Sequence, residues 1–299
     1  MPDHARSLLT QHARTTQLLG VDFLPLGTPP EHADNIRFAV SPNPEPPASP
    51  RSSSPKPEST IEPKPLHDFN TSPPAKATPY PSPDAIAIRD SYKSLKDPQS
   101  QLDALKDKYT TDAPHNHFNT SFNNIVFGEG SPAADLMFIG EAPGQTEDET
   151  GRPFVGRAGE LLNNMIAAMG LSRDTIYITN ILKTRPPKNA TPTREESLLC
   201  APYLYEQIRI INPKIIVTLG LPASHLLLDS ARTMRDLRGQ FHTFPADDQS
   251  DPQLKGLPPI DLMPTYHPAY LLRAYTQDNR RKVWSDLTKV MERLGLTKP

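Results

Sequence analysis

The sequence is poor in the features of secreted and membrane proteins. It contains one cysteine, Cys200, which excludes an intramolecular disulfide framework and favours a reducing compartment. It has no run of about eighteen or more apolar residues, so no membrane span is expected. The N-terminal stretch MPDHARSLLTQHARTTQLLG lacks a basic segment followed by a continuous apolar run, so it is not typical of a signal peptide. We therefore expect a cytoplasmic protein that does not enter a membrane.

A strong excess of charge of one sign is also lacking, because the net charge is -2. The charge is unevenly distributed, however. Residues 151–299 carry 20 Lys and Arg against 14 Asp and Glu, whereas residues 1–150 carry 12 against 20. Only the C-terminal half can therefore offer a basic surface to phosphate groups. A surplus of this size is also ordinary for a protein surface, so charge alone does not identify a nucleic-acid partner.

Proline is concentrated in one segment. Residues 25–85 hold 17 of the 36 prolines, interleaved with Ser, Thr, Glu and Lys, and such a composition cannot bury enough apolar surface to fold. We expect three parts: an N-terminal peptide (1–24), a disordered linker (25–85) and a folded domain (86–299). The apolar residues of the N-terminal peptide predict either a short helix that docks on a protein partner or a frayed terminal helix, and the pattern does not separate the two.

Short apolar runs alternate with helical periodicity in the C-terminal part. Strands are predicted at 135–140, 175–182, 214–220 and 260–268, and helices at 156–170, 193–211 and 278–295. Thr193 begins the second of these helices with Glu196 three residues later, which is the spacing of a capping box. Strands that alternate with helices predict an α/β protein of three layers, in which helices cover both faces of a central, mainly parallel four-stranded sheet.

Polar residues follow three of the predicted strands. The turn GEAPG (140–144) places Glu141 after the first strand, Asn180 ends the second, and His267 follows the fourth, directly before a proline. Taken singly, such an asparagine is more often a turn or cap residue, and such a histidine is more often a structural hydrogen-bonding group. The carboxyl ends of parallel strands meet at one edge of a sheet, where ligands bind, so together these residues predict a single site.

These motifs are parts of longer blocks. The blocks are VFGEG (126–130), LMFIGEAPGQTEDETGRPFVGRAGELL (136–162), YITNILKTRPP (177–187), IIVTLG (215–220), LRGQFH (237–242) and PTYHPAYLLR (264–273). In this order they make residues from about 124 to 292 resemble a family 4 uracil-DNA glycosylase, a bacterial and archaeal branch of the uracil-DNA glycosylase superfamily. The resemblance implies an enzyme that hydrolyses the N-glycosidic bond of uracil in DNA after base flipping, and so initiates base excision repair.

The resemblance also implies roles around the flipped base. Phe154 would stack on uracil. Asn180 would read its edge by fixing O4 and N3–H, which would leave donors facing donors if cytosine entered. Glu147 would crowd C5 and exclude the methyl group of thymine. His267 would donate a hydrogen bond to O2 of the leaving base, which a neutral imidazole can do.

Further positions would serve the sugar, the water and the DNA. Glu141, with the backbone of Ala142, would lie where water and sugar meet, and Gly144 in the same turn would bind the substrate. Superfamily members with an aspartate in this turn use it to position water, but this chain has Ala142 there, so the resemblance does not identify the group that activates water. Leu271 and Arg273 would enter the minor groove and contact phosphate, respectively. The alternative for the leucine is a place in a core helix.

The same resemblance implies a [4Fe–4S] cluster held by four cysteines, and here the chain departs from the family. The position in the family's K-C-R-P-P block is Thr184, the early cysteine pair falls near Ala113 and Asn116, and only Cys200 remains. We therefore predict that the protein has no metal cofactor and that Cys200 packs as a small apolar residue.

Two other functional classes compete with a monomeric enzyme that acts on uracil-containing DNA. The first is a catalytically weak or inactive DNA-binding protein that retains the glycosylase fold. The second is a nucleotide or sugar-phosphate hydrolase built on the GEAPG turn, and it lacks a cluster of metal-binding carboxylates. Release of free uracil from an oligonucleotide separates the enzyme from the binding protein.

Overall fold

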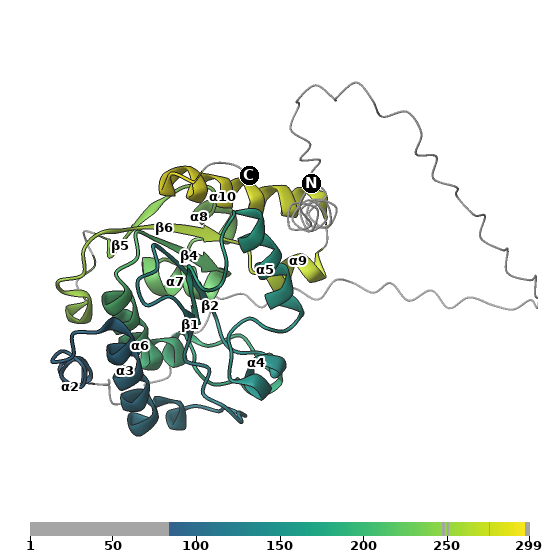
Figure 1. Ribbon diagram of the computed structural model, residues 1–299. Coiled ribbons are helices and arrows are strands. Elements are labelled where there is room, and N and C mark those ends of the chain that lie inside the picture. Colours follow the sequence, from purple (N-terminus) through teal and green to yellow (C-terminus); the bar gives the residue numbers. More distant parts are fainter. Residues whose placement is uncertain (1–83, 247–248, 250, 275, 297–299) are drawn as a thin grey trace, which may run out of the picture. The chain divides into compact units, whose positions relative to one another are not determined.

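The computed structural model describes residues 84–246, 249, 251–274 and 276–296 (Figure 1). The predicted N-terminal peptide and all but the last residues of the predicted linker lie outside the described residues, so the three-part division stays a prediction. The first described helix, α2 (Ala85–Asp90), begins within one residue of the predicted start of the folded domain. Asp84 caps it by accepting hydrogen bonds from the backbone amides of Ile86 and Ala87.

The centre of the fold is a six-stranded sheet in the order β1-β3-β2-β4-β6-β5. The strands are β1 (Glu129–Gly130), β2 (Leu136–Gly140), β3 (Tyr177–Asn180), β4 (Ile215–Leu219), β5 (His242–Phe244) and β6 (Ile260–Thr265). The four central strands, β3, β2, β4 and β6, are parallel and correspond to the four predicted strands. The predicted fold class is confirmed. The two short antiparallel edge strands, β1 on β3 and β5 on β6, were not predicted.

Every residue of β2, β3 and β4 is buried, which explains why their sequences are continuous apolar runs rather than alternating ones. The helix α6 (Arg194–Ile211) begins at the predicted capping box. The Thr193 side chain accepts from the backbone amide of Glu196, and the Glu196 carboxylate accepts from the amide of Thr193. In these elements the local sequence pattern therefore predicted the local structure.

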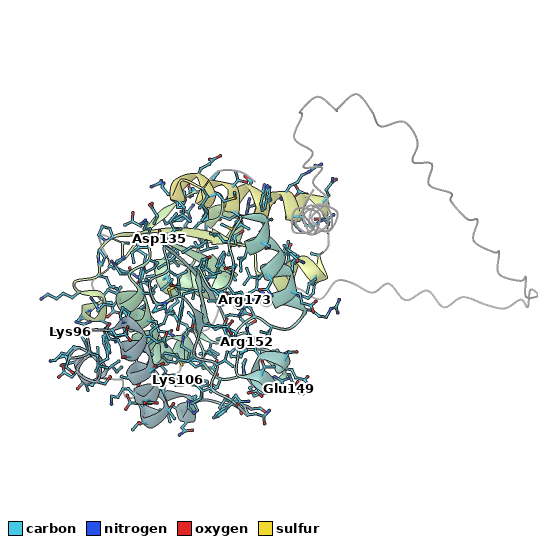
Figure 2. The ribbon with its side chains drawn as sticks, in the orientation of Figure 1. Lys96, Lys106, Asp135, Glu149, Arg152 and Arg173 are labelled. Atoms are coloured by element: carbon cyan, nitrogen blue, oxygen red, sulfur yellow. The ribbon has the colours of Figure 1, made fainter. Side chains whose placement is uncertain are left out.

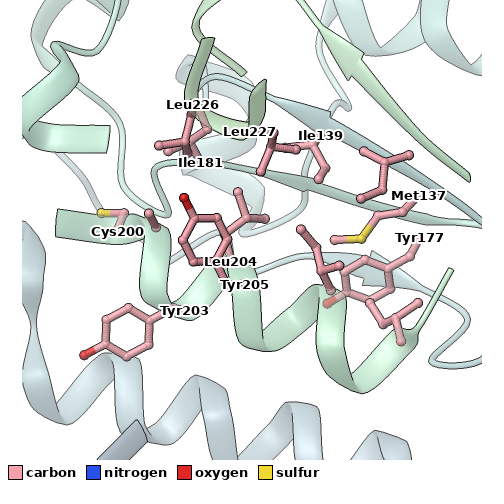
Figure 3. Packing of buried hydrophobic residues seen from close by; sticks show 14 of the residues in the cluster. Met137, Ile139, Tyr177, Ile181, Cys200, Tyr203, Leu204, Tyr205, Leu226 and Leu227 are labelled. Carbon is pink, nitrogen blue, oxygen red and sulfur yellow. The ribbon is translucent and has the colours of Figure 1, made fainter. Parts of the chain in front are cut away.

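Helices cover both faces of the sheet, and each face has its own apolar core (Figure 1). One core joins the sheet to α2, α3 (Pro98–Asp112), α6 and α7 (Leu221–Leu228). Part of this core, with Met137, Ile139 and Tyr177 of the sheet and Leu204 and Tyr205 of α6, is drawn in Figure 3. The other core joins the opposite face to α5 (Arg157–Ala168), α9 (Pro268–Arg273) and α10 (Gln277–Leu294).

The remaining elements are short. They are α4 (Gln145–Thr150), α8 (Met234–Leu237) and the 3₁₀ turns η1 (Pro114–His117), η2 (Pro187–Asn189) and η3 (Pro252–Leu254). In the part of the chain that the structure describes, no helix combines the length and the apolar character that a transmembrane span requires.

Candidate active site

A pocket of about 350 Å³ opens at the carboxyl ends of β2, β3 and β6. Strand β3 pairs with one edge of β2, and the next central strand along the chain, β4, pairs with the other edge. The pocket therefore lies at the topological switch point, where α/β proteins bind ligands. Eight of the predicted site residues line it: Glu141, Ala142, Gly144, Glu147, Phe154, Asn180, His267 and Arg273. The structure thus brings together residues that are up to about 130 positions apart in the sequence.

The floor of the pocket is formed where Gly140, Asn180 and Phe154 meet. Gly140 and Asn180 are paired at the ends of β2 and β3. A Cβ atom on Gly140 would lie 2.4 Å from the Asn180 Oδ1 atom and 2.4 Å from the Phe154 Cζ atom. Only glycine therefore lets the amide and the ring approach the strand end this closely.

The side chain of Asn180 is arranged to bind a ligand through its Oδ1 atom. It is 1% exposed, and its Oδ1 atom has no hydrogen-bond partner among the described residues. A buried acceptor without a partner costs on the order of 1–3 kcal/mol, so its persistence at a pocket wall indicates that a ligand supplies the donor.

A buried lysine, which was not predicted as a site residue from the sequence, binds the backbone of Asn180. The Lys183 Nζ atom donates to the Asn180 carbonyl oxygen at 2.7 Å, to the Thr179 Oγ1 atom at 2.7 Å and to the Gln207 Oε1 atom at 2.6 Å. All three donors of the ammonium are used, although burial lowers the pKa of Lys183 to about 7. The network ties the end of β3 to α6.

His267 is half-buried at the N-terminus of α9, and its surroundings define its protonation. Its Nδ1 atom accepts a hydrogen bond from the Ala269 amide at 3.1 Å, so the proton of the neutral ring is on Nε2. Burial, and to a smaller extent the charge of Arg273, lower the pKa of His267 to about 4. The ring lies 5.6 Å from the Phe154 ring, centroid to centroid. The neutral Nε2–H group of His267 therefore lies beside the Phe154 ring at the floor of the pocket.

Two carboxylates line the pocket and differ in their surroundings. Burial raises the pKa of Glu141, and the positive charge of Arg273 opposes this shift. Glu147, in α4, is already bound: its Oε1 atom accepts from the amides of Val155 at 2.8 Å and Gly156 at 2.7 Å. Glu147 therefore shapes the loop after Phe154 as well as the pocket wall, a second contact that the motif alone did not reveal.

The structure places Leu271, a predicted DNA contact, in the core, and its role in DNA binding stays a prediction. Leu271 is 0% exposed and belongs to the core under α5 and α10, so its side chain cannot enter a groove without breaking that core. The six-residue helix α9 directs the Leu271 side chain into the core. A sequence motif in so short a helix does not show which of its side chains face the core. Arg273, three residues from Tyr270 on the same helix, is exposed and lines the pocket.

Comparison with known proteins agrees with this geometry. The model of the uracil DNA glycosylase superfamily matches residues 127–288. A type-4 uracil-DNA glycosylase of Thermotoga maritima is 42% identical over 180 residues, which span 58% of this chain and 83% of the relative. One from Sulfurisphaera tokodaii is 42% identical over 56% of this chain and 74% of the relative, and one from Archaeoglobus fulgidus is 38% identical over 59% and 85%.

This chain belongs to the type-4 uracil-DNA glycosylase family. The matched region begins near β1 and ends within α10, so it includes every strand of the sheet and every residue that lines the pocket. The α2 and α3 helices precede the match to the superfamily model.

The residues at the family's cluster position do not fit a [4Fe–4S] group, which needs four thiolates. Cys200 is the only thiol, and burial raises its pKa to about 12, which disfavours the thiolate that binds iron. Among the described residues, no group of three or more His, Cys, Asp or Glu side chains is arranged to hold a metal ion. Thr184 is fully buried, and its Oγ1 atom has no partner in the described part of the chain.

Aromatic side chains pack in this region. The ring of Tyr109, in α3, lies 5.5 Å from that of His115 and 5.0 Å from that of Tyr203, between centroids. The His115 ring lies 4.8 Å from that of Phe122. The Tyr109 hydroxyl is next to the Cys200 thiol, which lies on α6 within the apolar core shown in Figure 3. Side-chain packing thus connects α3, η1 and α6.

Proposed function

We propose that this protein is a uracil-DNA glycosylase that flips uracil out of DNA into the pocket and hydrolyses its N-glycosidic bond, as the first step of base excision repair. The observation that carries the proposal is the Asn180 amide, which is buried at the pocket floor with an Oδ1 atom that lacks a partner among the described residues. The N3–H group of uracil would supply the missing donor.

Base selection follows from the same amide. The Asn180 Oδ1 atom would accept from N3–H of uracil while its amide nitrogen donates to O4. Cytosine carries an amino group in place of O4 and an unprotonated N3, so both contacts would become mismatched inside a buried site. Phe154 would stack on the base, and Glu147, held against the backbone of Val155 and Gly156, would crowd C5 and exclude thymine.

The chemical step needs a donor for the departing base. Breaking the bond gives the sugar oxocarbenium character and leaves negative charge on uracil. The Nε2–H group of His267 would donate to O2, where part of that charge develops, and would stabilise the transition state more than the bound substrate. Because the imidazole is neutral, it stabilises the uracil anion by hydrogen bonding without transferring a proton.

Glu141 and Arg273 would act at the other side of the bond. We assign the Glu141 carboxylate to the sugar and the attacking water, together with the backbone of Ala142 and Gly144. Arg273, exposed at the pocket rim, would contact a phosphate beside the flipped nucleotide. Arg157, also exposed at this rim, is a second candidate for such a contact. A monomeric state and a cytoplasmic location stay predictions.

The alternative of an inactive DNA-binding protein is not favoured, because the base-reading amide and the neutral histidine donor are both in the pocket. The decisive experiment incubates the full chain with an oligonucleotide containing one uracil, measures free uracil, and cleaves the abasic product with alkali. We expect uracil release and strand cleavage at the uracil position. Retardation of the oligonucleotide without release of uracil would support the inactive protein instead.

Asn180 variants test the base-reading role within the same assay. We expect Asn180→Ala to lose about 100-fold or more in single-turnover excision, since buried polar groups of uracil would then lack partners. Asn180→Asp should also lose uracil excision and should gain a measurable rate on cytosine. The control is Asn189→Ala, which removes an exposed amide at the pocket rim. Excision of uracil at the wild-type rate by Asn180→Ala would remove Asn180 from the base.

A further inference from the structure

The backbone at Phe154 adopts a conformation that an aromatic residue rarely takes. Its φ angle is 51°, in the left-handed region. Such a residue costs on the order of 1–3 kcal/mol and persists only where its surroundings enforce it. The ring at this position lies against Gly140, Asn180 and His267, so the turn determines the width of the base pocket.

The turn is enforced from two sides. The amide groups after Phe154 are held by the Glu147 carboxylate, as described above. The carbonyl groups are held by Arg173, which lies between α5 and β3. Its Nη2 atom donates to the Pro153 carbonyl oxygen at 2.6 Å, and its Nη1 atom donates to the Phe154 carbonyl oxygen at 3.1 Å. One guanidinium therefore binds the carbonyl groups of the two successive peptide units that flank the Phe154 Cα atom.

Arg173 is itself oriented. Its Nε atom donates to the Glu129 Oε1 atom at 3.0 Å, and its Nη1 atom also reaches the Asn163 Oδ1 atom at 3.0 Å. Its side chain is 17% exposed. Arg173 does not line the pocket, so it makes no contact there with a base. Its contacts to the loop are instead directed at the backbone that carries the Phe154 ring.

We propose that Arg173 is a positioning residue for uracil excision, which fixes the left-handed turn at Phe154 and thereby the stacking surface of the base pocket. This inference rests on the proposed function, because it takes Phe154 as the residue that stacks on uracil. Arginine suits the position because its planar group bonds two adjacent carbonyls and a carboxylate at once. Lysine could keep the ion pair with Glu129 but not both carbonyls.

The chain offers a matched control. Arg152 binds the same carboxylate, with its Nε atom 2.7 Å from the Glu129 Oε2 atom and its Nη2 atom 2.8 Å from Oε1, but no bond from it to the 153–154 carbonyls is present among the described contacts. It is 58% exposed. Both arginines form ion pairs with Glu129. Figure 2 labels the two arginines. Loss of either one removes an ion pair with Glu129, and only loss of Arg173 releases the turn.

The experiment compares Arg173→Gln with Arg152→Gln in the full chain. We expect Arg173→Gln to slow single-turnover excision about 10- to 100-fold, since a misplaced catalytic surface costs rates of this order. It should weaken inhibition by free uracil by a similar factor and leave the Kd for uracil-free DNA within about twofold. Arg152→Gln should stay within about twofold of wild type in all three measurements. Arg173→Lys should fall between them.

A double variant separates positioning from a general loss of stability. If Arg173 acts through the ring, Phe154→Ala/Arg173→Gln should excise uracil within about twofold of Phe154→Ala alone. Losses that multiply, an unchanged rate in Arg173→Gln, or equal losses in the Arg152 control would each overturn the inference. If Arg173→Gln does not fold, as judged by its thermal unfolding transition, Arg173→Lys replaces it in the comparison of single and double variants. Wild-type protein that releases no uracil would instead refute the proposed function.

Discussion

His267 illustrates at the scale of one residue how burial and a hydrogen bond select a chemical state. The Ala269 amide occupies Nδ1, and burial with the nearby Arg273 makes the charged imidazolium unfavourable. Histidine is the side chain that most often changes charge near neutral pH, but here the pKa near 4 keeps it neutral through that range. In its proposed role, His267 would therefore act as a constant hydrogen-bond donor rather than as an acid catalyst.

This state predicts a pH dependence of stability. The unfolded chain binds a proton at His267 below its ordinary pKa near 6.5, whereas the native protein does so only near 4. The contribution of His267 to the free energy of unfolding is therefore fully present above about pH 6.5 and falls as pH drops toward 4. Urea unfolding of wild type and His267→Gln at pH 7 and pH 5 should show a smaller loss on acidification in the variant.

The control for this prediction is His242→Gln, which changes a histidine outside the pocket. The same two His267 proteins test the chemistry. His267→Gln should lower the single-turnover rate and leave the Kd for uracil-containing DNA nearly unchanged, because the charge on O2 develops in the transition state. An equal pH dependence of stability in wild type and His267→Gln would show that the ring is not buried in the neutral form.

At the scale of elements, the pocket depends on how β3 is anchored to α6. Lys183 follows the end of β3 and joins the Asn180 carbonyl to Gln207 of α6, while the Gln207 Nε2 atom donates to the Phe127 carbonyl oxygen at 2.9 Å. The ammonium also lies 5.3 Å from the centroid of the Phe127 ring. The Asn180 amide, the proposed base-reading group, is thus supported by a buried polar network.

Removal of this lysine should affect stability and base reading together. Lys183→Met keeps the shape of the chain but leaves three buried acceptors without their donor, so we expect the free energy of unfolding to fall by about 2–4 kcal/mol. Single-turnover excision should decrease because the Asn180 backbone is released. Lys214→Met is the matched control: Lys214 is 69% exposed in its pair with Asp135, and its loss should cost less than about 0.5 kcal/mol. Chemical denaturation of both variants measures the difference, and equal losses would contradict the anchoring role.

The elements also show which parts of the fold the sequence can and cannot predict. The strands β2 and β4 are buried apolar runs, and α6 has a capping box, so local chemistry identified them. The strands β1 and β5 have two and three residues, too few for a periodic pattern, and they form only because a longer strand offers an edge. Pairing between distant residues is a property of the folded sheet.

The residues of the candidate site also fall into two groups, those that the sequence could predict and those that it could not. The residues that line the pocket follow strands in recognisable motifs, and they could be selected from the sequence. The positioning contacts of Arg173 and Lys183 could not be selected in this way. Lys183 stands in a motif, but the partners of both residues are backbone carbonyls and side chains from other elements, which a motif does not reveal. Leu271 stands in a motif, yet the packing of α9 against α5 and α10 places it in the core. Motifs identify residues near the ligand more readily than those that support them.

At the scale of the whole molecule, the departure from the family lies on the face of the sheet covered by α3 and α6. Relatives in this family are expected to join these segments through a metal cluster, whereas this chain packs Tyr109, His115 and Tyr203 together there. Tyr203 adds a hydrogen bond from its hydroxyl to the Asp112 Oδ2 atom at 2.5 Å, which connects α6 to the end of α3. Apolar burial and one polar contact therefore connect the two helices.

The last prediction follows from this packing. The purified protein should contain no stoichiometric iron by elemental analysis, because three of the four thiolates are absent. Cys200→Ala should lower the free energy of unfolding by only about 1 kcal/mol, the cost of truncating a small buried side chain. Tyr109→Ala should cost about 3–5 kcal/mol, since it deletes a fully buried ring between two helices. Both variants should excise uracil at the wild-type rate under conditions in which they are folded. Stoichiometric iron, or loss of excision in folded Cys200→Ala, would mean that Cys200 belongs to a metal centre and that aromatic packing does not replace it.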